Sequence, residues 1–326
     1  MIIIVGQTAT GKTKLALELA KKYNGELVNF DSRQIYKYLD IITGKDLPKN
    51  SEFIIQNLEL KSKYNIGYYS LAIYNHLKPF TTRLWLYDVV TPDQYFSSFD
   101  FVEKVKPVID DIKKRGKTPI LVGGTYLYIK HLLYGFNDNN VPPNFELRKK
   151  LDTKTVKELQ DILKKLSPES FNLLNHSDVN NPRRLMRKIE VAIFNSADLT
   201  DSTDLTDLTD SDRLNPISTN FNQFHVNSFI GLKYQDKSKL RQVIEKRVGE
   251  RLKNGAIDEV KSILKMGYKS SDPGLKTIGY QQIIKYLNNE LTKEKAIEDW
   301  INKEVQYAKR QLTFMKKDPN IQWREI

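Results

Sequence analysis

Short apolar runs alternate with amphipathic stretches along the first 135 residues. The run at residues 2–5 consists of four apolar side chains and ends at Gly6, which predicts a buried strand. Residues 12–22 place Leu15, Ala16, Leu19 and Ala20 on one helical face before Gly25. Further strands are predicted at 26–30, 84–90 and 119–122, and further helices at 100–116 and after Gly124. This alternation predicts an α/β fold whose mostly parallel sheet is flanked by helices.

Strand signals fade after residue 135. Amphipathic stretches at 155–166 and 183–194 predict a helical insertion subdomain, and residues 231–326 predict a helical C-terminal region. Residues 198–212 (DLTDSTDLTDLTDSD) hold six Asp and no Lys or Arg, so they bury too little apolar surface to order themselves. The expected divisions are 1–135 for the first part of the core, 136–195 for the insertion, 196–230 for a disordered acidic loop and linker, and 231–326 for helices that complete the core.

The composition of the chain excludes several classes of protein. The 326 residues are 40% hydrophobic, which supports a substantial core, and the absence of Cys excludes a disulfide scaffold, a thiolate zinc site and a cysteine nucleophile. No apolar run approaches the ~18 residues of a membrane helix, so we expect a soluble, cytoplasmic protein without a membrane partner. The net charge of +12 favours a polyanionic partner such as nucleic acid, although a solvated lysine-rich surface is the alternative. Residues 231–326 carry 21 Lys and Arg against 13 Asp and Glu.

A phosphate-binding motif lies between the first strand and the first helix. Its pattern, G-x-x-x-x-G-K-[ST], is matched by Gly6, Gln7, Thr8, Ala9, Thr10, Gly11, Lys12 and Thr13. Backbone N–H groups and the helix N-terminus would bind phosphate oxygens, Lys12 would reach the terminal phosphates, and Thr13 would ligate Mg²⁺. The motif predicts a phosphate loop but leaves the reaction open, since kinases, NTPases and group transferases all begin with bound phosphate.

Asp31 follows the second predicted strand. Ligands of open α/β sheets bind outside the carboxyl ends of the strands, so Asp31 is expected next to the phosphate loop. It could act as a general base, hold a Mg²⁺-bound water, or cap the next turn with Ser32. Arg33, Gln34 and Tyr36 could read a planar base or simply start a helix. Residues 84–88 could form a magnesium-binding strand that ends in Asp88.

Several separate motifs together resemble the bacterial tRNA dimethylallyltransferase family, also called tRNA isopentenyltransferases. The resemblance covers nearly the whole chain, in the family's order and spacing. Its segments are GQTATGKT (6–13), DSRQIY (31–36), PILVGGT with Leu127 and Tyr128 (119–128), NPRRLMRKIEV (181–191), IGY (278–280) and QYAKRQLTF (306–314).

The resemblance implies transfer of a dimethylallyl group from dimethylallyl diphosphate to N6 of adenosine 37 in the tRNA anticodon stem–loop, with Mg²⁺ and on a fold like that of phosphate-loop NTPases. Asp31 would be the general base, while Lys12 and a Thr13-bound Mg²⁺ would stabilise the leaving diphosphate. The target base must leave its stack to be read in a pocket. A monomer is expected.

The resemblance also implies which residues contact the substrates. The predicted tRNA-binding residues are Asp31, Ser32, Arg33, Gln34, Thr125, Arg148, Arg183, Arg184, Leu185, Met186 and Arg187, and Lys309 and Arg310 form a further basic patch. Lys237 stands where the family often has a diphosphate-binding Arg, and it keeps the charge without the bidentate fork. Leu84 and Trp85 stand where the family usually has paired histidines, and residues 43–46 depart from its GTAKP element.

Three other functions could use the same phosphate loop. A phosphate-loop kinase would use Asp31 as base toward a hydroxyl but leaves the distant motifs unexplained. A non-enzymatic RNA-binding switch would hold nucleotide in the loop and need no chemistry from Asp31. A related isopentenyltransferase could act on free adenine nucleotides, although the long basic C-terminal half favours a macromolecular acceptor.

Overall fold

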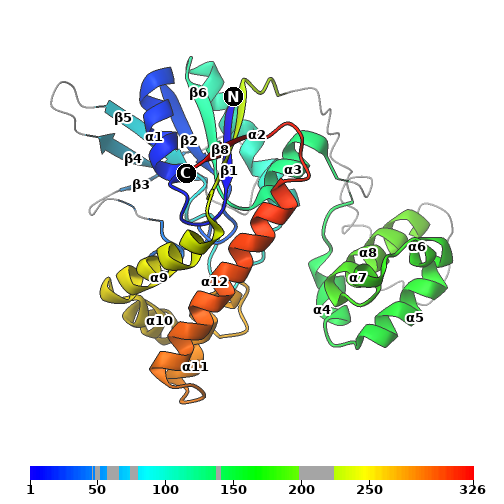
Figure 1. Cartoon of the computed structure of the whole chain (residues 1–326). Coiled ribbons are helices and arrows are strands. Elements are labelled where there is room, and N and C mark those ends of the chain that lie inside the picture. Colours follow the sequence, from blue (N-terminus) through cyan, green and yellow to red (C-terminus); the bar gives the residue numbers. More distant parts are fainter. Residues whose placement is uncertain (46, 48–51, 57–65, 74–79, 137–140, 198–223) are drawn as a thin grey trace. The chain divides into compact units, whose positions relative to one another are not determined.

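The computed structural model describes residues 1–45, 47, 52–56, 66–73, 80–136, 141–197 and 224–326 (Figure 1). The chain divides into two compact units. Unit 1 comprises Met1–Leu133 and Asn222–Ile326, and unit 2 comprises Tyr134–Phe221. The acidic tract at 198–212, predicted to be a disordered loop, lies outside the described residues.

The described part of unit 1 is built on an eight-stranded sheet with the order β3-β4-β5-β2-β6-β1-β7-β8. Among the described strands only β4 runs opposite to the others, being antiparallel to both β3 and β5, so the predicted mostly parallel sheet is confirmed. The strands are β1 (Ile2–Gly6), β2 (Gly25–Asn29), β3 (Phe53–Ile55), β4 (Gly67–Ile73), β5 (Phe80–Trp85), β6 (Thr118–Val122), β7 (Ser228–Lys233) and β8 (Gln322–Glu325).

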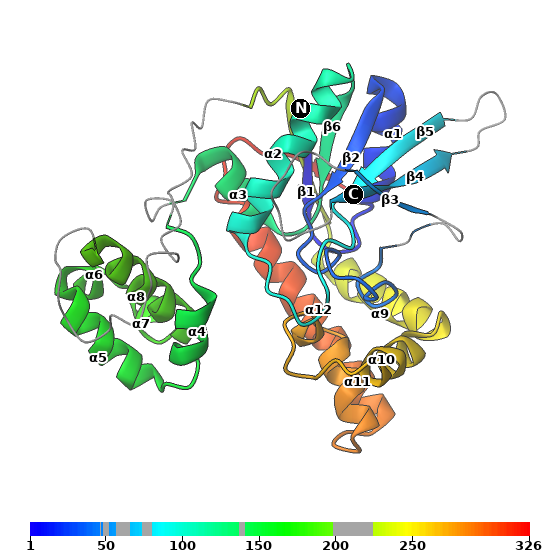
Figure 2. The same ribbon diagram turned by 180° about the vertical axis from the view of Figure 1, so that it is seen from behind.

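Helices cover both faces of this sheet (Figures 1 and 2). Ala16 and Ala20 of α1 (Lys12–Tyr23) pack with Ile2, Ile4 and Leu27 of the strands, because alternate strand residues point to the same face. Helix α2 (Ser98–Lys114) covers the other face. The remaining helices of this unit are α3 (Tyr126–Tyr134), α9 (Lys237–Lys253), α10 (Ala256–Lys265), α11 (Tyr280–Leu287) and α12 (Lys293–Met315).

Four strands lie where the sequence analysis placed none. Strand β7 falls across the predicted linker (196–230) and the predicted helical region, yet it pairs with β1 near the centre of the sheet. Its apolar run is too short for periodicity to distinguish a strand from a helix, and its partner is more than 200 residues away. Strands β3, β4 and β8 were also missed. The strand predicted at 84–90 is instead β5, which ends at Trp85 before positive φ values at Leu86 and Asp88.

Helix α2 begins two residues before the helix predicted at 100–116 and ends two residues before its predicted end. Ser97 is its N-cap, and Asp100 completes a capping box by accepting hydrogen bonds from Ser97. The helix continues through Pro107, with apolar residues on either side of the proline buried against the sheet.

Unit 2 is helical throughout its described part. Helices α5 (Val156–Leu166) and α8 (Pro182–Ala197) match the stretches predicted at 155–166 and 183–194. They bury Leu159, Leu163 and Ile189 in a core of their own. The other helices are α4 (Phe145–Leu151), α6 (Pro168–Asn172) and α7 (His176–Val179). In the described part of the chain, no helix is both long and apolar enough to cross a membrane.

We expect Gly231→Ala in β7 to destabilise the protein. A Cβ at this position would lie 2.5 Å from Cγ2 of Ile321 and 2.7 Å from Cε3 of Trp323. The overlap should lower the free energy of unfolding by about 1–3 kcal/mol in urea denaturation. Gly249→Ala is the matched control, because its Cβ meets no atom within 4 Å and should raise helix stability by up to about 1 kcal/mol. Equal stabilities of the two variants would contradict this packing.

Candidate functional site

Three loops meet at the carboxyl edge of the sheet, after β1, β6 and β2. Asp31 lies beside the phosphate loop, as predicted, although β6 separates β2 from β1. Gly123 and Gly124 follow β6, and the missing side chain at Gly124 leaves space that its neighbours fill. A Cβ there would lie 2.5 Å from Nε2 of Gln311 and 3.2 Å from Oδ2 of Asp31. The glycines therefore allow Asp31 to approach the phosphate loop across an intervening strand.

The phosphate loop is closed by its own hydrogen bonds. The hydroxyl of Thr10 donates to the carbonyl of Gln7 at 2.8 Å, and Nζ of Lys12 donates to the same carbonyl at 2.7 Å. Gly11, with φ 75°, starts α1, whose first turn holds no acidic side chain. The free N–H groups of this turn therefore face no competing carboxylate on their own helix, as an anion site requires.

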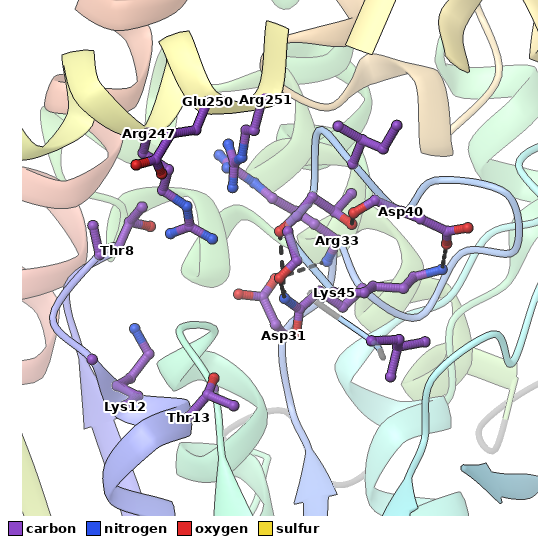
Figure 3. Close-up of a pocket in the computed structure, with 18 of the residues that line it drawn as sticks. Thr8, Lys12, Thr13, Asp31, Arg33, Asp40, Lys45, Arg247, Glu250 and Arg251 are labelled. Atoms are coloured by element: carbon purple, nitrogen blue, oxygen red, sulfur yellow. Dashed lines mark hydrogen bonds and ion pairs between the residues drawn. The ribbon is translucent and has the colours of Figure 1, made fainter. Parts of the chain in front are cut away.

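Helix α9 supplies cations across the cavity from this loop. The cavity has a volume of about 940 Å³ and is lined by residues 8–13, by Asp31, Arg33 and Gln34, and by Lys246, Arg247 and Arg251 of α9. Figure 3 shows Arg247 reaching from α9 toward the space above Lys12. These cations were not predicted, although Arg247 and Arg251 stand four residues apart on a basic segment of the sequence.

Lys237 was the residue that the sequence analysis chose for the diphosphate on this helix. It is the first residue of α9, and its side chain lies outside the described residues. Its contact with diphosphate stays a prediction.

Lys12 is strongly perturbed by the cavity. Burial lowers the pKa of its ammonium to about 8, partly opposed by attraction to Asp31 and reinforced by repulsion from Arg247. A bound phosphate group would add negative charge and raise this pKa again.

The carboxylate of Asp31 is held in a fixed turn. Its backbone N–H donates to Oδ1 of Asn29 at 2.9 Å, and its own Oδ1 accepts the N–H of Arg33 at 3.0 Å. The N–H of Ser32 donates to the hydroxyl of Thr125 at 2.9 Å. The turn thus joins the loop after β2 to the loop after β6, and Asp31 lines the cavity.

Arg33 and Gln34, predicted to contact tRNA, already have partners in the protein. Nη1 of Arg33 donates to Oε1 of Glu304 at 3.0 Å, and its guanidinium lies 3.9 Å from the ring centroid of Tyr307. Nε2 of Gln34 donates to the carbonyl of Gly44 at 2.7 Å. Both residues line the cavity, so their side chains form part of its wall, and the side of each that faces the cavity is open to a ligand.

One stripe of α12 supports all of these loops. Glu304, Tyr307, Ala308 and Gln311 share a face through spacings of three and four residues. Oε1 of Gln311 accepts the N–H of Thr8 at 3.1 Å, and its Nε2 donates to the carbonyl of Gly124 at 3.0 Å. The carbonyl of Ala308 accepts Nε2 of Gln7 at 3.3 Å. The sequence analysis quoted this segment as a motif but did not identify its buried face.

The predicted basic patch lies on the other side of this helix. Lys309 and Arg310 are exposed, as are Lys316 and Lys317 just after its end. They are accessible to a polyanion.

Within unit 2, the predicted arginines differ in availability. Arg148 forms a bidentate pair with the buried Glu190, at 2.9 and 2.7 Å, and Arg187 donates to the same carboxylate at 2.6 Å. Arg183 and Arg184 are both exposed, and Arg184 pairs with Asp178. Leu185 and Met186 are buried in the core of the unit, so the structure places them behind the surface rather than on it.

The predicted magnesium-binding segment at 84–88 reaches the cavity through Tyr87 and not through Asp88. The carboxylate of Asp88 accepts hydrogen bonds from Lys45 and from the hydroxyl of Tyr69, and Asp88 is absent from the cavity wall. Lys45, in the segment that departs from GTAKP, reaches the cavity and also binds Asp40 at 2.5 Å. Asp88 therefore supports the wall through Lys45.

Thr13 fits a magnesium ion that is shared with a diphosphate. Its side chain is exposed on the first turn of α1, and its hydroxyl makes no hydrogen bond to other described residues. Among the described residues, no group of three or more carboxylate, His or Cys side chains could hold a metal alone. Mg²⁺ often takes one or two protein ligands together with substrate phosphates, which suits this arrangement.

We expect pyrophosphate binding to take up a proton above pH 8. Lys12, with its pKa lowered to about 8, is largely neutral there and recovers its charge beside the anion, so affinity should fall as pH rises. Calorimetry at pH 8.5 in two buffers of different ionisation enthalpy measures the uptake. Lys12→Met should lack this part of the uptake, and equal uptake in both proteins would contradict the assignment.

We expect Gln311→Leu to destabilise the protein and weaken pyrophosphate binding. The variant leaves the N–H of Thr8 and the carbonyl of Gly124 without their buried partner. The free energy of unfolding in urea should fall by about 1–3 kcal/mol per group left unpaired. Gln306→Leu, an exposed position on the same helix, is the control and should change neither quantity. A wild-type pyrophosphate affinity in Gln311→Leu would show that the bridge does not organise the loop.

Comparisons with known proteins agree with this geometry. Residues 79–318 match the family model described as IPP transferase. A tRNA dimethylallyltransferase of Thermoanaerobacter sp. (strain X514) is 32% identical over 99% of this chain and 90% of that protein. One from Acetivibrio thermocellus is 35% identical over the same shares.

Solved structures give the same result. The full-length tRNA isopentenylpyrophosphate transferase from Bacillus halodurans has a TM-score of 0.60 and 28% identity, over 99% of this chain and 89% of that one. A eukaryotic dimethylallyltransferase acting on tRNA, 21% identical with a TM-score of 0.67, shares the fold. The motifs, the phosphate loop beside Asp31 and the match along nearly the whole chain lead to one assignment: the chain belongs to the IPP transferase family, whose named relatives are tRNA dimethylallyltransferases.

Proposed function

We propose that the protein transfers the dimethylallyl group of dimethylallyl diphosphate to N6 of adenosine 37 in the anticodon stem–loop of tRNA. The observation that carries this proposal is the single cavity lined by the phosphate loop, by Asp31 and by the cations of α9. The diphosphate leaving group needs the phosphate loop and the cations, and the acceptor, which loses a proton, needs a base such as Asp31 beside them. The family relationship supports tRNA as the acceptor.

The phosphate-loop side of the cavity stabilises the leaving group. Allylic diphosphates break their C–O bond readily when the departing charge is neutralised. The N–H groups of the loop, Lys12 and Arg247 can bind diphosphate oxygens from opposite walls. Thr13 would hold a Mg²⁺ ion, which would supply further positive charge for the leaving group.

The Asp31 side of the cavity receives the adenine amine. As the bond from C1 of the allyl group to N6 forms, the bond from C1 to the diphosphate oxygen breaks with its electron pair, and N6 becomes positively charged. Asp31 then accepts one N6 proton, which leaves neutral N6-dimethylallyladenosine and free diphosphate. The turn that fixes Asp31 keeps its carboxylate in place for this transfer.

Each unit contributes a surface for tRNA in this proposal. Lys309 and Arg310 on α12 and Arg183 on α8 are exposed and can contact phosphates. Arg148, Arg187 and Glu190 hold α4 to α8, so their part in binding is to shape unit 2. Ser32, Arg33, Gln34 and Thr125 surround Asp31, where the extruded base would enter. One chain provides every residue of the cavity, so we propose a monomer that works in the cytoplasm, where tRNA is modified.

The experiment incubates the protein with Mg²⁺, dimethylallyl diphosphate and unmodified tRNA that carries A37, followed by nucleoside mass spectrometry. We expect N6-dimethylallyladenosine from the wild type and a rate lower by about 10²–10⁴-fold in Asp31→Asn, which loses the base. Asp110→Asn, an exposed carboxylate on α2, is the control and should keep the wild-type rate.

Parallel reactions separate the alternatives. Modified AMP without modified tRNA would indicate an isopentenyltransferase for free nucleotides. Transfer of the γ-phosphate of ATP to a small acceptor, with no prenylated product, would indicate a kinase. Either result would contradict the proposal, as would full activity of Asp31→Asn.

A further inference from the structure

Glu304 is a buried carboxylate to which the proposed reaction gives no role. It lies in the middle of α12 and is 1% exposed. Carboxylates are seldom this deeply buried without a charged partner, because losing water costs several kcal/mol. Glu304 has two such partners, and both line the cavity while Glu304 itself stands behind them.

The first partner is Arg33, two residues after Asp31. Nη1 of Arg33 lies 3.0 Å from Oε1 and 3.3 Å from Oε2 of Glu304, and Tyr307 lies against the guanidinium plane at 3.9 Å. The second partner is Arg251 of α9, whose Nη1 is 3.8 Å from Oε1. Glu304 thus fixes the direction in which the Arg33 side chain points.

Asp31 competes with Glu304 for this guanidinium. Burial alone would lower the pKa of Arg33, but interactions with Glu304, then Tyr307 and Asp31, more than offset it and raise that pKa. Asp31 is therefore the second carboxylate that attracts Arg33, and the Arg33 backbone N–H already binds its Oδ1. If Glu304 lost its charge, Asp31 would be the remaining carboxylate among the groups that attract this guanidinium.

We propose that Glu304 is a positioning residue for the transfer: by holding the Arg33 guanidinium against Tyr307, it keeps Asp31 free of a side-chain ion pair and able to accept the N6 proton. This inference rests on the proposed function. The backbone and the side chain of Arg33 then act differently on Asp31. The backbone N–H orients the carboxylate, while the guanidinium is held away from it.

Several other charged or titratable groups act on Asp31, and none of them duplicates this arrangement. Lys12 of α1 attracts it from the phosphate loop, and Arg247 of α9 shares its cavity. Tyr128 of α3 and Tyr307 of α12 interact with it, and burial raises the pKa of both hydroxyls, so they remain neutral. Lys12 faces the diphosphate in the proposed reaction. Of the two cations that Glu304 holds, Arg33 at 3.0 Å is closer than Arg251 at 3.8 Å.

The test compares Glu304→Gln with Glu298→Gln, the same change at an exposed position of α12. Both are assayed at steady state from pH 5 to 8, with saturating tRNA and varied dimethylallyl diphosphate, which gives kcat and KM. For Glu304→Gln we expect a kcat lower by about tenfold, which is less than the loss of about 10²–10⁴-fold expected when the general base itself is removed. The acid limb of its pH profile should move to lower pH, because an adjacent cation favours the ionised carboxylate. KM for dimethylallyl diphosphate should not rise, since every phosphate-binding cation remains.

Two further variants show whether the effect passes through Arg33. Glu304→Asp keeps the charge and should keep the wild-type acid limb. On an Arg33→Gln background, Glu304→Gln should cause no further shift of the acid limb, as a double-mutant cycle requires for coupled residues. If Glu304→Gln alone fails to fold, this double variant, which leaves no unpaired charge on either residue, carries the test.

The outcomes separate the inference from the proposed function. A wild-type protein that prenylates tRNA, beside a Glu304→Gln variant that matches Glu298→Gln, would overturn the inference alone. The inference would also be overturned if Glu304→Gln lowered kcat equally on the wild-type and Arg33→Gln backgrounds. The same holds if the acid limb of the double variant were shifted from that of Arg33→Gln. A wild-type protein that forms no prenylated tRNA would remove the proposed function and this inference together.

Discussion

The amide of Gln311 joins the two loops on which the cavity depends. Its oxygen accepts the N–H of Thr8 in the phosphate loop, and its nitrogen donates to the carbonyl of Gly124 in the loop after β6. The contact is possible because position 124 has no side chain to exclude the amide. A single buried group from the C-terminal helix α12 therefore fixes the spacing between bound diphosphate and Asp31, although the three segments are far apart in the sequence.

The cavity wall also shows how opposite charges are kept apart within one small space. Lys12 and the α9 cations line the phosphate side, where burial, reinforced by repulsion from Arg247, lowers the pKa of Lys12. Asp31 stands among them as the proposed base. Glu304 pairs with Arg33 from behind the wall, and in the proposed reaction this directs the positive charge of the site toward the diphosphate rather than toward Asp31. Diphosphate binding and proton acceptance can then operate within about 940 Å³.

Local patterns explain which parts of the site were predictable. The phosphate loop, Asp31 and the glycines after β6 lie in short motifs whose spacing is visible in the sequence, and the exposure of Lys309 and Arg310 followed from their helix. Strand β7 and the cations of α9 were missed because their roles arise from pairing with segments more than 200 residues away. Glu304 and Arg148 look like surface charges in a linear sequence, and only their partners, Arg33 and Glu190, show that they are structural.

A structure of the protein with an anticodon stem–loop, Mg²⁺ and an unreactive dimethylallyl diphosphate analogue, with sulfur in place of the bridging oxygen, tests the central claim most directly. The account predicts the diphosphate on the N–H groups of residues 8–13 with Lys12 in contact, and the extruded adenine with N6 about 3 Å from Asp31. An adenine amine bound by another residue, or a diphosphate held outside the phosphate loop, would contradict it.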